Sequence, residues 1–175
     1  KFSLHVKITN SFRVNYLHEL NRGYDAAQLM KTDWGKGIQK DYPQIQLITD
    51  PAFITVVYED KIIDGFSTSI RQNPFHGANA NKNVTLVASL TQDNILTELP
   101  RIVTLIEESA KRQDLTVADT AIAWFKQYLN ISLTPLIGIF NKYGFGSEFH
   151  QQNVMVEFDE NLFPSKFYFR DNQGY

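Results

Sequence analysis

The chain has 175 residues, of which 43% are hydrophobic and 13% aromatic, enough for one domain with a sizeable core. Its net charge of −2 excludes the global basic field that drives binding to nucleic acids or anionic membranes. The absence of cysteine excludes disulfides, zinc–thiolate sites and cysteine nucleophiles. No apolar run approaches the roughly 20 residues needed to cross a bilayer, so we expect a soluble, cytoplasmic protein with neither nucleic-acid nor membrane partners.

The first half of the chain is mostly strand-like. Alternating apolar and polar residues over 2–9 predict a strand with one buried face, followed at 10–13 by a strand end or the start of a helix. An amphipathic helix is expected over 25–40, although Gly35 and Gly37 weaken its end. β-branched and aromatic segments predict further strands, the first three as a meander, at 45–49, 53–58, 66–70 and 84–90.

The second half begins with helices. The spacing of apolar residues predicts three of them, over 97–112, 116–130 and 136–143. Thr116 is placed to cap the second helix, and Gly144 suits the left-handed residue that ends the third. Two strand-like runs around a turn then predict a hairpin, with strands at 154–158 and 166–169.

This order of elements predicts an α+β fold, in which an antiparallel sheet packs with a helical group. No repeat and no long linker divides the chain. We therefore expect one compact unit with a strand-rich part (1–90), a helical part (95–143) and a hairpin part (148–171). The chain starts inside a strand-like run and stops just after a motif, so we expect it to be a fragment of something larger.

Polar side chains gather on both sides of the predicted hairpin. Two antiparallel strands bring the residue before the first close to the residue after the second, so Asn153 and Asp171 are expected at the same end. A side-chain amide and a carboxylate can share Mg²⁺, which prefers oxygen ligands and retains waters when it binds phosphates. With Glu148 as a further acid, these residues predict a site for a metal-bound nucleotide.

His150, between these groups, has two interpretations. As imidazolium it can neutralise charge that develops on a polyphosphate, and as imidazole it can move a proton. In the alternative, His150 is a packed, hydrogen-bonded histidine and Asn153 simply begins a strand. The surrounding polar groups favour the functional interpretation.

Thr9, Arg13 and Arg71 lie at or just beyond predicted strand ends. A hydroxyl and a guanidinium in such places can fix a polyanion, and arginine supplies a planar fork for carboxylate or phosphate. Strand-end arginines are nevertheless more often solvated. For Arg71 the sequence slightly favours a salt bridge or the support of a turn.

Four segments carry a resemblance to a known family. They are KFSLHVKITNSFR (1–13), IRQNP (70–74), YGFGSEFHQQN (143–153) and FRD (169–171). In this order they resemble the NRPS-independent siderophore (NIS) synthetases of the IucA/IucC family, and the block Glu-x-His-x-Gln-Asn is the most specific part. Members of that family use ATP and Mg²⁺ to adenylate a carboxylate of citrate or a related acid, and then pass the acyl group to an amine or hydroxylamine.

The resemblance implies a hand-like fold of fingers, palm and thumb, of which this chain is a central portion. It also implies two groups of site residues. The group at ATP is Thr9, Asn153, Glu148 and Asp171, the last three with Mg²⁺. The group at the carboxylate substrate and the adenylate is Arg13, His150 and Arg71, with Arg13 and His150 in the catalytic role.

Family members are several times longer than this chain, so we expect the 175 residues alone to be inactive or poorly active. A homodimer is compatible with the pattern but not required by it. One alternative is a kinase-like Mg-ATP phosphotransferase, which would need a catalytic Asp shortly after the His, where this chain has Gln151 and Gln152. Another is a binding domain without catalytic function.

Overall fold

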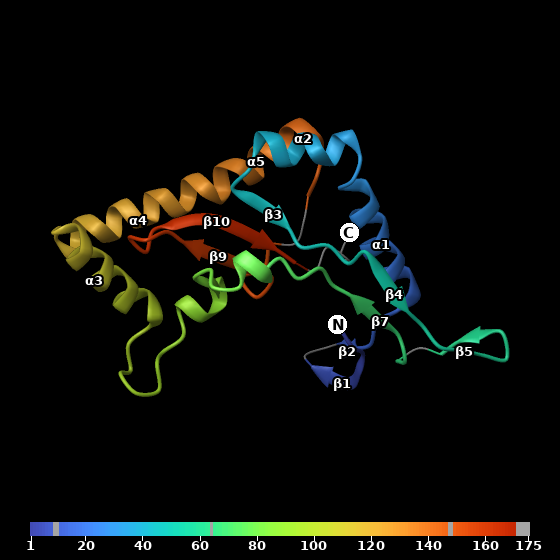
Figure 1. The fold of residues 1–175 in the computed structure, drawn as a ribbon. Coiled ribbons are helices and arrows are strands. Elements are labelled where there is room, and N and C mark those ends of the chain that lie inside the picture. The colour runs from blue at the N-terminus through green and yellow to red at the C-terminus, as the bar shows by residue number, and fades with distance from the viewer. Residues whose placement is uncertain (9–10, 64, 147–148, 171–175) are drawn as a thin grey trace. The chain divides into compact units, whose positions relative to one another are not determined.

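The structure is a computed structural model that describes residues 1–8, 11–63, 65–146 and 149–170 (Figure 1). Its backbone divides into two units, the first made of residues 1–37 and 48–74 and the second of residues 38–47 and 75–170. Helices and antiparallel strand pairs confirm the predicted α+β class. Among the described residues, no helix is both long and apolar enough to cross a membrane.

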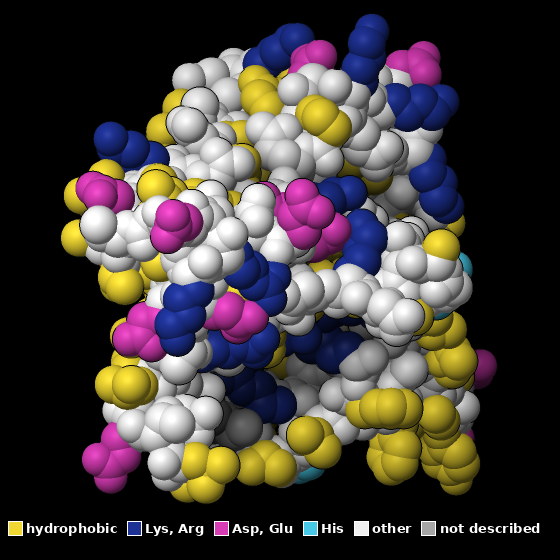
Figure 2. Space-filling model, turned by 60° about the vertical axis from the view of Figure 1, so that its left-hand side comes forward, with side chains coloured by type: hydrophobic (Ala, Val, Ile, Leu, Met, Phe, Trp, Pro, Cys, Tyr) yellow, Lys and Arg dark blue, Asp and Glu magenta, His cyan; other side chains and the backbone are white. Residues whose placement is uncertain are grey.

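The strands of the first unit are short and pair in twos. The antiparallel pairs are β1 (Leu4–Ile8) with β2 (Ser11–Arg13), β4 (Ala52–Ile54) with β7 (Thr68–Ile70), and β5 (Val57–Tyr58) with β6 (Lys61–Ile62). The buried face predicted for 2–9 is wrong, because Phe2, Leu4 and Val6 are exposed by 80%, 59% and 51%. A two-stranded ribbon is too thin to cover its own apolar face. Hydrophobic side chains also lie among charged ones on the face drawn in Figure 2.

Two helices replace the single helix predicted over 25–40. Helix α1 spans Leu17–Leu29 and helix α2 spans Asp33–Asp41, so α1 begins well before the prediction. A Cβ on Gly35 would lie 2.4 Å from the Cα of Met30, and therefore only glycine allows this close approach of backbone. Gly35, which the sequence suggested as a weak point of a single helix, is the residue that permits the turn between α1 and α2.

The second unit is built on a four-stranded sheet. Its strands, in spatial order, are β3 (Ile45–Leu47), β10 (Pro164–Phe169), β9 (Val154–Phe158) and β8 (Val84–Leu86). Strands β9 and β10 confirm the predicted hairpin. Strand β3 pairs in parallel with β10 and so does not join the predicted meander. The predicted strand over 84–90 is β8 followed by a short 3₁₀ helix, η2 (Val87–Leu90).

Three helices follow, as predicted. They are α3 (Arg101–Gln113), α4 (Val117–Ile131) and α5 (Leu133–Tyr143). The Thr116 hydroxyl accepts a hydrogen bond from the Asp119 N–H at 3.1 Å, which confirms the predicted cap of α4. Gly144 ends α5 with a φ of 65°, the left-handed conformation predicted for it.

Helix α4 runs along the β9–β10 hairpin (Figure 1), and aromatic side chains join the two. The Trp124 ring packs on Phe158 with centroids 6.5 Å apart, and Tyr128 meets Phe167 edge-on at 5.2 Å. The buried Trp124 indole N–H donates to the Leu162 carbonyl in the hairpin turn at 3.0 Å. Packing and a buried hydrogen bond thus fix the hairpin that carries the predicted site residues.

The other face of the hairpin carries a polar cluster. The Tyr168 hydroxyl donates to the Glu157 carboxylate, and Lys82 Nζ lies 3.0 Å from each Glu157 oxygen. Tyr168 is only 2% exposed, and burial together with the neighbouring carboxylate raises its pKa. The neutral phenol is therefore the form that the folded protein favours.

This cluster predicts a loss of stability in alkali. The unfolded chain loses the Tyr168 proton near pH 10, whereas the folded state retains it, so the contribution is complete below about pH 10 and falls as the pH rises further. We expect the free energy of unfolding of the wild type to fall more steeply than that of Tyr168→Phe, by up to about 1.4 kcal/mol per pH unit. Urea unfolding between about pH 9 and 11 would measure both slopes. Tyr128 and Tyr143, whose pKa values are also raised, remain in both proteins, so any difference in slope comes from Tyr168. Equal slopes would mean that the pKa of Tyr168 is not raised by folding.

Candidate functional site

The open end of the hairpin places Asn153 next to the end of β10. The backbone N–H of Arg170 donates to the Asn153 carbonyl at 3.0 Å. Arg170 directly precedes Asp171 in the sequence, so the pairing follows the predicted geometry up to the last described residue of this strand. Asp171 and Glu148 themselves lie outside the described residues, and their predicted roles stay predictions.

Three contacts anchor the segment around His150. They are the edge-to-face packing of Phe149 on Phe169 with centroids 4.7 Å apart, the hydrogen bond from the Ala88 N–H to the Gln151 carbonyl at 3.1 Å, and the bond from the Arg170 guanidinium to the Gln152 carbonyl at 2.9 Å. The last contact ties Arg170, the residue before Asp171, to this segment. The His150 side chain is exposed, and the choice between its two interpretations stays open.

Asn153 closes the turn that follows His150. Its backbone N–H donates to the His150 carbonyl at 2.7 Å. Its side-chain amide makes no hydrogen bond within the described part of the chain. With the carboxylates of Glu148 and Asp171, this amide oxygen would form the all-oxygen donor set that Mg²⁺ prefers.

In the first unit, Arg13 ends β2 and is exposed. Over residues 1–8, 11–63, 65–146 and 149–170 no ion pair is made by its guanidinium, and its predicted contact with the carboxylate substrate stays a prediction. Thr9 lies outside the described residues. Its predicted contact with ATP stays a prediction.

Asn15 ties the segment around Arg13 to β7, a role that sequence analysis missed. Its buried side-chain amide donates to the carbonyls of Lys1 (3.1 Å) and Ser67 (3.2 Å). Its backbone N–H donates to the Ser3 hydroxyl at 2.9 Å. A single asparagine between a strand and a helix is most simply interpreted as a turn residue, so the sequence gives no sign that its side chain is buried.

Arg71 forms a salt bridge, as the sequence slightly favoured. Its Nε and Nη2 atoms lie 2.7 Å and 2.9 Å from the two Asp50 oxygens, a bidentate arrangement. Asp50 is 5% exposed and also accepts from the Ser69 hydroxyl at 3.3 Å. Arg71 is thus used to neutralise a buried carboxylate. Its predicted contact with substrate is not tested by this geometry.

The predicted site residues therefore form two groups, each within one unit. Arg13 and Arg71 belong to the first unit, and His150 and Asn153 belong to the second. Within the described ranges, no three acidic or histidine side chains form a cluster that could hold a metal ion. Two of the three predicted Mg²⁺ ligands are outside those ranges, so the metal site stays a prediction.

Two family models match the chain. The model of the IucA / IucC family matches residues 1–92, and a model described as a ferric iron reductase FhuF-like transporter matches residues 122–175. The first covers the Arg13 and Arg71 segments. The second covers most of α4, all of α5 and the hairpin.

Three relatives match the chain over nearly its whole length. A spermidine-citrate ligase from Bacillus anthracis is 40% identical over 175 residues, which are 100% of this chain and 28% of the ligase. An N(2)-citryl-N(6)-acetyl-N(6)-hydroxylysine synthase from Vibrio mimicus is 33% identical, over 99% of this chain and 29% of the synthase. The solved structure of ATP-bound aerobactin synthetase IucA from a hypervirulent pathotype of Klebsiella pneumoniae matches with a TM-score of 0.92 and 26% identity, over 99% of this chain and 31% of that one. The chain thus spans under a third of the length of each.

Proposed function

Because the chain belongs to the IucA/IucC family, we propose that it is part of an ATP-dependent siderophore synthetase in the cytoplasm. In this proposal the protein adenylates a carboxylate of citrate or a related polycarboxylic acid, releases pyrophosphate, and joins the acyl group to an amine or hydroxylamine with release of AMP. Relatives named for citrate products and the ATP-bound solved relative support it.

The observation that carries the proposal is the anchored segment 149–153. Its contacts with β10 and η2 hold an exposed imidazole beside an available amide oxygen. Adenylation needs this kind of arrangement, because a carboxylate must be positioned to attack a phosphorus atom while negative charge is offset. A rigid segment supplies both positioning and a cation without covalent chemistry.

Each residue has a task in this chemistry. The Arg13 fork matches a citrate carboxylate and would orient it, while His150 as imidazolium would offset charge on the phosphate under attack. Asn153, with Glu148 and Asp171, would hold Mg²⁺, whose contribution is to neutralise phosphate charge. When the amine attacks the acyl carbon, neutral His150 is suited to accept the proton that the amine loses.

Product analysis tests the proposal. The full-length protein is incubated with ATP, Mg²⁺ and citrate, with and without hydroxylamine as a simple acceptor, and the nucleotides and phosphates are separated. We expect AMP and pyrophosphate that depend on citrate or on a related tricarboxylate. Formation of ADP would instead indicate the kinase-like phosphotransferase. Failure to consume ATP with any acid would indicate a binding domain.

A further inference from the structure

The end of helix α5 is tied to the end of helix α2 within the second unit (Figure 1). Asp41, the last residue of α2, accepts two hydrogen bonds on one oxygen, Oδ2, from the Lys142 ammonium and the Tyr143 hydroxyl. These two donors are the last two residues of α5. Within α5, Gly138 leaves room for the Tyr42 hydroxyl, which lies 2.3 Å from where a Cβ of residue 138 would stand. Helix α5 is thus packed closely against the residues that end and follow α2.

Asp41 is also joined to the sheet that carries the site segment. Strand β3 begins four residues after Asp41 and pairs in parallel with β10. The Phe167 N–H of β10 donates to the Gln44 carbonyl, just before β3, at 2.8 Å. Strand β10 also holds the 149–153 segment through an aromatic contact. The end of α5 and the 149–153 segment are therefore fastened to the same sheet, the first through Asp41 and the second through β10.

The part of the chain that follows α5 carries two proposed site residues. Gly144 comes directly after the last residue of α5, and Glu148 and His150 follow four and six positions later. A movement of the last turn of α5 would therefore shift the start of the stretch from which both groups would reach the nucleotide. Adenylation is sensitive to such shifts, because a displacement of about 1 Å at the reacting groups can lower the rate about 10²-fold.

We propose that Asp41 is a positioning residue for this site, which fixes the last turn of α5 and through it the start of the stretch that contains Glu148 and His150. The inference rests on the proposed function. The Lys142 and Asp41 side chains are 60% and 31% exposed, and ion pairs in such places contribute little to the stability of a fold. Removal of the Asp41 carboxylate should therefore leave the fold intact, so that an effect on the site can be separated from a loss of stability.

Hydrogen–deuterium exchange in the full-length protein tests the anchor without an assay of activity. The variants are Asp41→Ala and Asp41→Asn, whose amide oxygen can accept both hydrogen bonds that Oδ2 accepts. The matched control is Asp33→Ala, because Asp33 pairs with Lys36 in the exposed first turn of the same helix. We expect Asp41→Ala alone to raise the exchange rate of the amides in 149–153 by at least about fivefold. Unchanged exchange there, or an equal rise in Asp33→Ala, would overturn the inference.

Citrate-dependent pyrophosphate release then separates positioning from stability. We expect Asp41→Ala to lower kcat about tenfold. The KM for citrate should change by less than about threefold, because Arg13, which would orient citrate, belongs to the first unit. Asp41→Asn and Asp33→Ala should stay within about twofold of the wild type.

Two results would overturn the role of Asp41 in the reaction. They are equal losses of kcat in Asp41→Ala and Asp41→Asn, and an unchanged kcat in both. A wild-type protein that releases no pyrophosphate would instead overturn the proposed function, and the exchange rates would still decide whether Asp41 anchors the segment.

Discussion

His150→Ala in the full-length protein is expected to lower citrate-dependent pyrophosphate release by about 10²–10⁴-fold. In the proposed mechanism the exposed imidazole is the charged or proton-moving group of the anchored 149–153 segment. The segment is held through the Phe149 ring and the carbonyls of Gln151 and Gln152, so the variant removes the chemistry without releasing these contacts. Initial rates, together with far-UV circular dichroism, would measure the effect.

His76→Ala is the matched control for this experiment. His76 is an exposed histidine of the same unit, directly before the 3₁₀ helix η1 (Gly77–Asn79) and outside the predicted site. We expect its rate to stay within about twofold of the wild type. If His150→Ala retained the wild-type rate and a native spectrum, the catalytic assignment of His150 would be wrong.

Arg71→Ala is expected to destabilise the fold by about 3–5 kcal/mol. The change removes the guanidinium that meets both oxygens of Asp50, a carboxylate only 5% exposed, and leaves that charge without its bidentate partner. Urea unfolding would measure the loss. The double variant Asp50→Asn with Arg71→Ala should recover part of it, because the stranded charge is then gone.

The same experiment separates the two interpretations of Arg71. A loss below about 1 kcal/mol would mean that the ion pair contributes as little as an exposed one, and would favour the substrate-binding role. A large loss that is partly recovered in the double variant would show that the main task of Arg71 is structural. Any effect on citrate binding should then be read from the double variant, whose fold is less disturbed.

Local signals in the sequence predicted the second unit well. Helix α4 follows the expected range and cap because Thr116 and Asp119 lie three residues apart, which is a local motif. Helix α1 was largely missed, since its N-cap is Tyr16, a residue outside the usual capping set, and its capping box depends on Glu19. The parallel pairing of β3 with β10 joins distant parts of the chain, and no local pattern indicates it.

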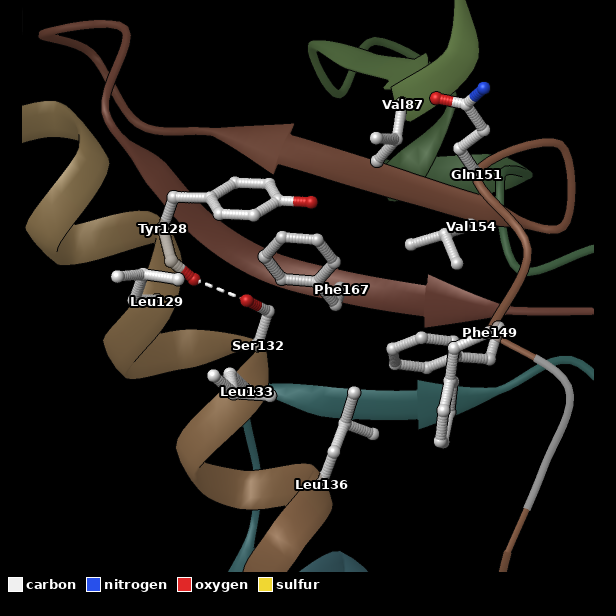
Figure 3. Close-up of a pocket in the computed structure, with 11 residues that line it drawn as sticks. Val87, Tyr128, Leu129, Ser132, Leu133, Leu136, Phe149, Gln151, Val154 and Phe167 are labelled. Atoms are coloured by element: carbon white, nitrogen blue, oxygen red, sulfur yellow. Dashed lines mark hydrogen bonds between the residues drawn. The ribbon is translucent and has the colours of Figure 1, made fainter.

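The site was predictable to the extent that it is contiguous. The block from Glu148 to Asn153 contains its polar groups in six consecutive positions, so sequence alone could identify it. The pocket that lies next to α4 and α5 (Figure 3) could not be found from sequence patterns, because α4, α5 and both hairpin strands each contribute only a few of its lining residues. The Arg71–Asp50 ion pair could not be predicted from the sequence either, because the two residues are 21 positions apart on segments with no shared motif.

The position of β10 inside the sheet determines when this unit can fold during synthesis. β10 lies between β3 and β9, yet it is the last of these four strands to leave the ribosome, far behind β3. Until it emerges, β3 has no neighbour in its sheet and Ile45 has no apolar cover from that strand, a state prone to wrong pairing. Such long-range parallel pairing also folds slowly. Of the four strands, the end of the hairpin that carries Asn153 is therefore completed last, and nascent chains that stop short of β10 contain His150 and Asn153 without the strand that anchors their segment.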